Sequence, residues 1–401
     1  MGLQCVQCKG TKMLCGKVAC PLLIQMQSRK GLEDKLKDNE LLGQSPSVFV
    51  GSFNYPKVFV GPLTGSQLSM DDESSRWYGT PLDKIIDYRT QLFRGKEAIR
   101  TDEALNPGKR LSTIQEIAMS EKHVDTDLVF KKKPKLDISF NQTTAPYGPT
   151  GDTQSLILES NPKIPRVMDK TVSDELKSVE GMMQLYSHDI TMDEIQRVLS
   201  VGLLGIQKKL VPTRWSITAS DDTIGKKLLD EIRDFDELDE YLVFESDYLS
   251  NHFQIILTPG KWSFEQLEYY VPGSVWVKEN EDPIIMKDSE GYYNRTKYAF
   301  NVAGGYYAGR LGVCEGLIRM KRQATSIIVR EIGSGYYAPV GVWQVRESVR
   351  HAMKSKPEKF GSLNEALESV ASKLEAKNRW EKQSELLSKA RSRDIMRKFM
   401  T

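Results

Sequence analysis

The sequence lacks the features that would direct it into or across a membrane. No stretch approaches the roughly 18 consecutive apolar residues of a membrane span. The N-terminus has no charged head followed by an apolar run, so we see no secretion signal. We therefore expect an intracellular, cytoplasmic protein with no membrane partner.

Common catalytic patterns are also missing. The 401 residues include only four histidines, widely spaced, and no H-E-x-x-H, G-x-S-x-G or EF-hand pattern. Neither G-x-x-x-x-G-K-[ST] nor G-x-G-x-x-G occurs in a fitting context. Adjacent acidic pairs carry little information in a chain with 54 acidic residues. We assign no catalytic residue.

The charge balance lacks a dominant sign. Lys and Arg number 56 and Asp and Glu 54, which leaves a formal charge of +2 and excludes a chain-wide field for polyanions. Hydrophobic residues make up 39% and charged residues 27%, as in soluble globular chains. The length exceeds the 250–300 residues or so that one core supports, so we expect two or three domains.

Cysteine is rare and concentrated. Four of the five cysteines lie near the start in the pattern C-x2-C-x6-C-x4-C, at Cys5, Cys8, Cys15 and Cys20. Four thiolates suit a tetrahedral, structural Zn²⁺ site, because they fill every position around the metal. An iron–sulfur cluster uses the same ligands, and four free thiols are the remaining alternative. Cys314 lies in an apolar segment and is expected in the core.

The body of the chain mixes strand and helix patterns without strict alternation. Short β-branched and aromatic runs ended by Gly and Pro indicate strands, and S/T-x-x-[DE] patterns indicate helix starts. The sequence therefore predicts an α+β fold with mixed sheets and packed helices, preceded by the zinc module and followed by a helical tail. We place the domains at residues 1–44, 45–275, 276–386 and 387–401. Predicted strands include residues 47–51, 57–63, 241–248, 252–257 and 275–277. Helix starts are predicted at Thr171, Thr191, Ser220 and Ser362.

Two groups of residues are candidates for a phosphate or nucleotide pocket. A strand-like run that carries Arg214 precedes the predicted helix start at Ser220–Thr223, where free backbone amides bind anions. The segments Gly304–Arg310 and Gly333–Pro339 each combine glycines with a tyrosine pair, which allows close approach and stacking. The pocket candidates are Arg214, Ser220, Thr223, Tyr306, Arg310, Tyr336 and Arg346. The alternative is that these glycines serve helix packing.

Basic residues gather at two further places. The run Lys131–Lys135 lies in a polar, Pro-bearing section, and is either a phosphate-facing loop or a solvated surface loop. The C-terminus carries Met396, Phe399 and Met400 at i, i+3, i+4 spacing beside positive charge. Such a tail fits an apolar groove on a partner, or is the last turn of a packed helix.

Taken together, several segments resemble the archaeal Nre family of DNA repair proteins. They are the four-cysteine start, Val48–Gly51 with Val58–Leu63, the run Leu210–Ile217, and the Gly-Tyr-Tyr segments. The resemblance covers nearly the whole chain.

The resemblance implies a role in repair of DNA damage and binding to the archaeal sliding clamp (PCNA). In the family a C-terminal box of the form Q-x-x-[apolar]-x-x-[aromatic]-[aromatic] binds the clamp. Met396 matches its apolar position, and Phe399 and Met400 its aromatic pair. Arg393 stands where the family has glutamine, and Met400 replaces an aromatic residue with one that also fills apolar pockets.

Three hypotheses for the function follow. The first is a repair factor tethered to DNA by the clamp, which raises its local concentration without strong intrinsic affinity. The second is an enzyme acting on nucleotides or nucleic acid through the candidate pocket. The third is a zinc-containing RNA-binding protein, although no aromatic residue interrupts the run at Lys131–Lys135, as single-strand platforms require.

Overall fold

The chain folds into two compact units. The computed structural model describes residues 38–134 and 147–400, with side chains up to Ser392, and the isolated residues Cys8, Cys20, Leu23, Leu32 and Leu36. Unit 1 comprises residues 1–20, 142–144 and 225–401, and unit 2 comprises residues 21–141 and 145–224. The predicted domain boundaries after residues 44, 275 and 386 stay predictions.

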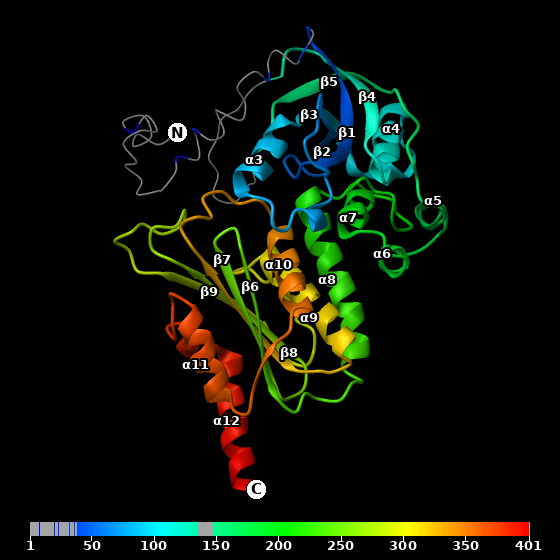
Figure 1. Cartoon of the computed structure of the whole chain (residues 1–401). Helices are drawn as coiled ribbons and strands as arrows, with labels where there is room; N and C mark the ends of the chain where they lie inside the picture. Colours follow the sequence, from blue (N-terminus) through cyan, green and yellow to red (C-terminus); the bar gives the residue numbers. More distant parts are fainter. Residues whose placement is uncertain are drawn as a thin grey trace. The chain divides into compact units, whose positions relative to one another are not determined.

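Unit 2 is built on a closed five-stranded barrel (Figure 1). Its strands are β1 (Glu40–Val50), β2 (Lys57–Gly65), β3 (Phe93–Arg100), β4 (Val124–Phe130) and β5 (Thr150–Leu158). They follow the order β1-β2-β3-β5-β4, and β1 closes the barrel by pairing with β4. The β3–β5 pair is parallel and the others are antiparallel.

This topology is that of an OB fold. In an OB fold, a five-stranded Greek-key barrel has this strand order and a helix between the third and fourth strands. Here α4 (Lys109–Met119) fills that place. The connection L12, residues 51–56, joins β1 to β2, and the connection L45, residues 131–149, joins β4 to β5.

The strand sequences fit the barrel because apolar residues alternate. Val58 and Val60 of β2 are buried, whereas Phe59 between them is half-buried on the outer surface. Gly61 is needed where β2 crosses β3, since a Cβ there would lie 2.1 Å from the carbonyl oxygen of Gly95. A cluster of buried side chains fills the interior, including Leu41, Phe93, Leu128 and Phe130.

Further helices complete unit 2. They are α3 (Leu82–Gln91), α5 (Arg166–Ser173), α6 (Ser178–Ser187), α7 (Met192–Ser200) and the first part of α8 (Thr213–Ile232). Two short 3-10 segments span Ser74–Arg76 and Thr101–Leu105. The capping box predicted at Thr191 is confirmed, because its hydroxyl accepts the Glu194 amide at 3.3 Å.

Unit 1 contains a six-stranded mixed sheet. Its strands are β6 (Tyr241–Tyr248), β7 (Asn251–Thr258), β8 (Ser263–Tyr270), β9 (Ile284–Glu290), β10 (Thr325–Ile332) and β11 (Glu358–Phe360). The order is β11-β6-β7-β10-β8-β9. Neighbours β10 and β8 run parallel, and the other pairs are antiparallel.

Helices cover both faces of this sheet, so both faces are buried (Figure 1). One face packs against α9 (Gly304–Met320), α10 (Trp343–Lys354) and the end of α8, and the other against α11 (Leu363–Lys373) and α12 (Glu385–Met400). A short 3-10 turn at Glu381–Gln383 precedes α12. None of the helices in the described part of the chain combines the length and apolar character needed to cross a membrane.

The predicted α+β class with mixed sheets is confirmed, and two local predictions are wrong. Residues 275–277 form no strand, although Val275 and Val277 are buried. Thr171 does not start a helix but lies inside α5, where its hydroxyl donates to the Val167 carbonyl oxygen at 2.7 Å. A hydroxyl one turn along a helix makes this bond as readily as a cap.

Candidate functional site

Two of the four predicted zinc ligands lie outside the described residues. Cys5 and Cys15 lie outside them, whereas Cys8 is buried and Cys20 is partly exposed. Within residues 38–134 and 147–392, no cluster of His, Cys, Asp and Glu could hold a metal ion. The zinc module stays a prediction.

The C-terminal tail belongs to a helix whose base is fixed in unit 1. The buried carboxylate of Glu265 on β8 accepts the backbone amides of Glu385 at 2.9 Å and Leu386 at 3.2 Å. It thereby caps the N-terminus of α12, whose amides have no partners within the helix. In Figure 1, α12 continues past the sheet towards the C-terminus. The side chains of the predicted box, Arg393, Met396, Phe399 and Met400, lie outside the described residues.

The three pocket candidates on helices α9 and α10 of unit 1 lie in its interior. Arg310 on α9 is fully buried and pairs with Glu290 on β9 at 3.0 Å. Tyr306, one turn earlier, is also fully buried, and burial raises the pKa of its phenol. Arg346 on α10 is 1% exposed and lies 3.4 Å from Glu347. These side chains are packed among protein groups, which the glycine-packing alternative expects.

A second buried network surrounds Arg330 on β10. Its guanidinium donates to Glu268 at 2.7 Å, to Asn251 at 2.9 Å and to Gln344 at 3.2 Å. Tyr336, the remaining pocket candidate, lies 5.8 Å from this guanidinium and accepts the Val340 amide at 3.1 Å. Because each of these donors meets an acceptor, the network joins strands and helices in the core of unit 1.

The predicted helix start at Ser220–Thr223 is wrong. Helix α8 begins at Thr213, so Ser220 and Thr223 lie inside it, where backbone amides bond to carbonyl groups one turn earlier. Ser220 is fully buried and donates to the Ile217 carbonyl oxygen at 3.0 Å. Pro212 sets the start instead, because proline fits the beginning of a helix. No free amides for an anion exist at Ser220.

Arg214, in contrast, lies at an exposed site. It belongs to the first turn of α8, which packs beside loop L12 of the barrel: the Val50 amide donates to the Thr213 hydroxyl at 2.9 Å. The neighbouring Trp215 is 46% exposed and contacts Tyr55 of L12. We did not predict these aromatic residues as part of a site, although Trp215 directly follows the candidate Arg214 in the sequence.

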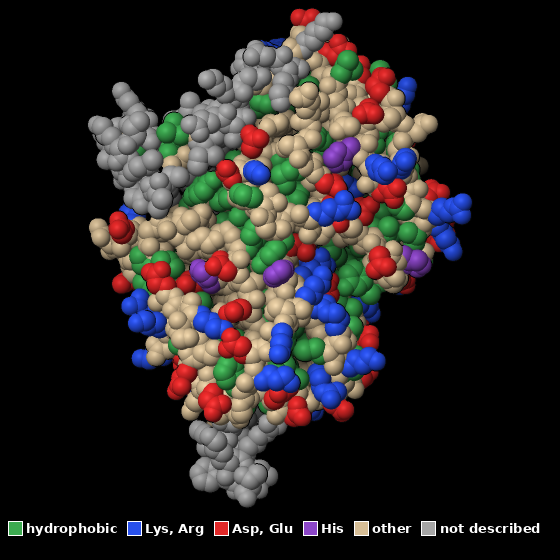
Figure 2. Space-filling model, in the orientation of Figure 1, with side chains coloured by type: hydrophobic (Ala, Val, Ile, Leu, Met, Phe, Trp, Pro, Cys, Tyr) green, Lys and Arg blue, Asp and Glu red, His purple; other side chains and the backbone are tan. Residues whose placement is uncertain are grey.

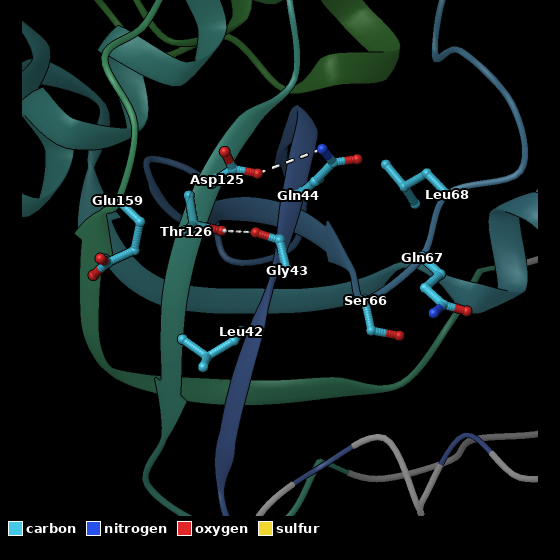
Figure 3. A pocket seen from close by; sticks show the side chains of 9 residues that line it. All are labelled: Leu42, Gly43, Gln44, Ser66, Gln67, Leu68, Asp125, Thr126 and Glu159. Atoms are coloured by element: carbon cyan, nitrogen blue, oxygen red, sulfur yellow. Dashed lines mark hydrogen bonds between the residues drawn. The ribbon is translucent and has the colours of Figure 1, made fainter.

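The barrel also carries an open cavity of about 570 Å³ (Figure 3). Hydrogen bonds join β1 and β4 beside it: Gln44 donates to Asp125 and the Thr126 hydroxyl to the Gly43 carbonyl oxygen, both at 3.4 Å. The charged side chains that line it are Asp125 and Glu159. Two carboxylates and no cation make this cavity unsuitable for a phosphate.

Comparison with known proteins covers nearly the full length. The N-terminal model of the archaeal Nre family matches residues 14–277, and its C-terminal model matches residues 290–399. The chain belongs to the archaeal Nre family. It is 35% identical to DNA repair protein NreB of Archaeoglobus fulgidus, across 98% of this chain and 99% of that relative.

Two further relatives extend this similarity within the family. DNA repair protein NreA of Archaeoglobus fulgidus is 37% identical over 94% of this chain and 95% of its own. NreA of Haloferax volcanii is 37% identical over 83% of this chain and 82% of its own. No solved structure matches the chain. The assignment of the barrel as an OB fold therefore depends on its strand order and pairing.

Proposed function

We propose that this protein is a DNA repair factor that the sliding clamp recruits to DNA through the C-terminal helix. The observation that carries the proposal is the match over 98% of the chain to a relative named as a DNA repair protein. A structural zinc module completes the proposal, because four thiolates form a donor set that Zn²⁺ prefers.

The charge and the tail support recruitment by a partner. With a formal charge of +2, the chain does not hold DNA by a global field, and Figure 2 shows acidic and basic side chains interspersed over one face. Helix α12 is capped at its base by Glu265, and its last described side chains, Arg391 and Ser392, are exposed. A helix held at one end presents its terminal turn to a groove.

Calorimetric titration of the sliding clamp tests recruitment. We expect the full chain to bind, and a chain ending at Arg391 and the variant Phe399→Ala not to bind. Lys398→Ala is the matched control, because Lys398 lies outside the spacing of the box and should retain the affinity. Equal binding by all four proteins, or binding by none, would contradict the proposal.

Metal analysis tests the zinc module. We expect about one zinc per chain after purification without added metal, and loss of that zinc in Cys5→Ser and Cys15→Ser. Cys314→Ser is the control, since Cys314 is fully buried in α9 and should not affect the metal content. Iron in place of zinc would favour the cluster alternative.

A further inference from the structure

The outer surface of the barrel in unit 2 brings together segments that are far apart in the sequence. Loop L12 follows Val48–Gly51, strand β2 contains Val58–Leu63, and Leu210–Ile217 supplies the start of α8. Two hydrogen bonds fix the last segment: the Val50 amide donates to the Thr213 hydroxyl, and the Leu210 amide donates to the Thr101 carbonyl oxygen, both at 2.9 Å. Three of the segments that carry the family resemblance therefore meet beside L12.

Exposed aromatic rings mark this place. Phe53 in L12 is 74% exposed, Tyr55 is 52% exposed and Trp215 is 46% exposed. The centroids of the Tyr55 and Trp215 rings lie 5.3 Å apart. Large aromatic side chains left in water and held by neighbouring backbone hydrogen bonds offer flat faces on which a further ring can stack.

On the strands beside L12, cationic side chains lie over aromatic rings. The guanidinium of Arg94 on β3 lies 3.8 Å from the centroid of Phe49 on β1 and 4.5 Å from that of Tyr147 in L45. Lys96, two residues along β3, lies 5.0 Å from the centroid of Phe59 on β2. The two cations thus stand on the outer surface formed by β1, β2 and β3.

Arg94 makes no ion pair with any residue in the described part of the chain, and its Nε has no hydrogen-bond partner there. Burial lowers its pKa to about 10, so the side chain remains cationic at neutral pH. A partly buried cation without a carboxylate lacks the stabilisation that pairing gives. An incoming phosphate would supply that missing negative charge.

Further basic residues flank the strands at both ends. Lys57 starts β2 opposite Arg100, and Lys131 and Lys132 start L45. All three lysines are exposed, and the Lys131 amide donates to the Asp152 carbonyl oxygen at the start of β5. From Arg94 to Arg100, β3 spans roughly 20 Å at about 3.3 Å per residue, which gives a track several nucleotides long.

Carboxylates on this surface are fewer and engaged. Asp152 lies 3.7 Å from Lys96, and Asp102 bonds to Arg100 at 3.1 Å. Glu97 pairs with Arg110 of α4 at 2.8 Å. The surface therefore combines stacking rings with cations, whereas the charged side chains that line the cavity of Figure 3 on the same barrel are both carboxylates.

We propose that L12, the β2–β3 surface and the first turn of α8 form a binding site for single-stranded DNA. Bases stack on Phe53, Tyr55 and Trp215, and the backbone phosphates follow Arg94, Lys96 and the flanking lysines. Stacking with a cationic track is how single strands are bound without sequence preference, and this surface of an OB barrel is suited to it. The proposal goes beyond clamp recruitment and depends on neither the tail nor the zinc module.

Fluorescence anisotropy with a labelled oligothymidylate of about 15 nucleotides and the full chain, without the clamp, tests the site. We expect saturable binding that weakens as salt rises. Trp215→Ala and Tyr55→Ala should each weaken it about tenfold, as for the loss of one stacking ring. Phe53→Ala, at the most exposed of the three positions, is a further variant with little risk to folding.

Tyr293→Ala is the matched control, because Tyr293 is 83% exposed and belongs to unit 1. Its affinity should stay within about twofold of the unchanged chain, well below the effect of a stacking ring. Absence of saturable binding would overturn the proposal, as would equal affinities of Trp215→Ala, Tyr55→Ala and the control. Tighter binding of oligouridylate RNA or of a duplex of equal length would overturn the assignment to single-stranded DNA.

These outcomes are independent of the recruitment proposal. The anisotropy assay contains no clamp, and the calorimetric titration contains no DNA. A chain ending at Arg391 lacks the C-terminal box but keeps the barrel. Binding of DNA by this chain would show that the barrel site does not need the tail.

Discussion

At the scale of single residues, unit 1 holds several charges away from water, each next to an opposite charge. Arg310 and Glu290 are both fully buried and lie 3.0 Å apart. Removing one partner leaves the other charge buried and uncompensated, which costs far more than the pair itself contributes. The sequence predicted Arg310 as a residue of a phosphate site. This prediction could not be tested without the structure, because a sequence does not show whether a glycine-rich helix faces water or a strand.

We expect Glu290→Gln to lower the free energy of unfolding by about 3–5 kcal/mol. The measurement is urea unfolding followed by circular dichroism. Glu281→Gln is the control, since Glu281 forms an exposed pair with Lys278 at 2.9 Å, and it should have no measurable effect. Equal stability of Glu290→Gln and the unchanged chain would contradict the role given to the pair.

At the scale of elements, the glycines of α9 allow the helix to pack closely. A Cβ at Gly312 would lie 2.8 Å from Val349 on α10, and one at Gly316 would meet Met353 of the same helix at 2.3 Å. Within the segment Gly304–Arg310, Gly309 is packed in the same way, since a Cβ there would lie 2.3 Å from the Gln266 side chain on β8, as the packing alternative expects. Spacing alone could not decide it, because the same glycines also suit close approach of a ligand.

Gly312→Ala should lower the free energy of unfolding by about 1–3 kcal/mol, because the added methyl group pushes α9 from α10. This outweighs the gain of about 1 kcal/mol in helix propensity. Gly225→Ala in α8 is the matched control, since its Cβ would meet Arg310 at an ordinary 3.5 Å. It should be neutral or stabilising, and thermal unfolding of both variants would show the opposite signs.

A surface cluster joins α11 to the sheet and makes stability depend on pH. Lys373 pairs with Glu245 at 2.8 Å and with Glu358, and its hydrogen bonds hold the pKa of both carboxyl groups below the usual 4.5. A depressed pKa stabilises the fold above the unfolded value, and this contribution is lost as pH falls through the folded pKa.

Lys373→Met should therefore make the free energy of unfolding fall less steeply as the pH drops below about 5, which is the acid limb of the stability curve. The effect should be about 0.5 kcal/mol, since solvent screens these partly exposed groups. Urea unfolding between pH 3 and 7 measures it. An unchanged acid limb would mean that the ion pairs contribute nothing to the docking of α11.

Local sequence signals predicted several elements and missed others for identifiable reasons. The capping box at Thr191 is confirmed. The helix start at Ser362 is also confirmed, because its hydroxyl accepts the Glu365 amide, although the Glu365 carboxylate accepts the Gly361 amide rather than that of Ser362. The helix start predicted at Ser220 is wrong, because the helix begins earlier, directly after Pro212. Strand β5 lay unpredicted in the polar, Pro-bearing section that follows Lys131–Lys135, because its first half exposes Asp152 and Gln154 and buries Thr153 rather than an apolar residue.

At the scale of the whole molecule, the sequence predicted the α+β class but not the barrel. Closure depends on β1 pairing with β4, at residues 79 to 89 positions apart, and on the parallel β3–β5 pair. No local pattern encodes such a register. The aromatic and basic residues of the proposed DNA site form one surface only once the barrel is closed. No local pattern in the sequence therefore indicates that Lys131 and Trp215 belong to the same site.

A protein with a clamp-binding tail and a barrel that binds single strands would attach to loaded clamps at two points. The second attachment is intramolecular, which raises apparent affinity by about 10²–10⁴ when both sites are engaged. On clamp-loaded DNA with a single-stranded stretch, we expect Trp215→Ala and Phe399→Ala each to lose most of this gain.

Biolayer interferometry on immobilised, clamp-loaded DNA distinguishes two attachments from one. The double variant Trp215→Ala with Phe399→Ala should bind more weakly than either single variant, because each single change leaves one attachment in place and the double change weakens both. Single variants that bind nearly as tightly as the unchanged chain would mean that the tail and the barrel do not engage the loaded clamp and its DNA together. The unchanged affinity of Tyr293→Ala with Lys398→Ala would show that the loss comes from these two sites rather than from any aromatic or basic residue.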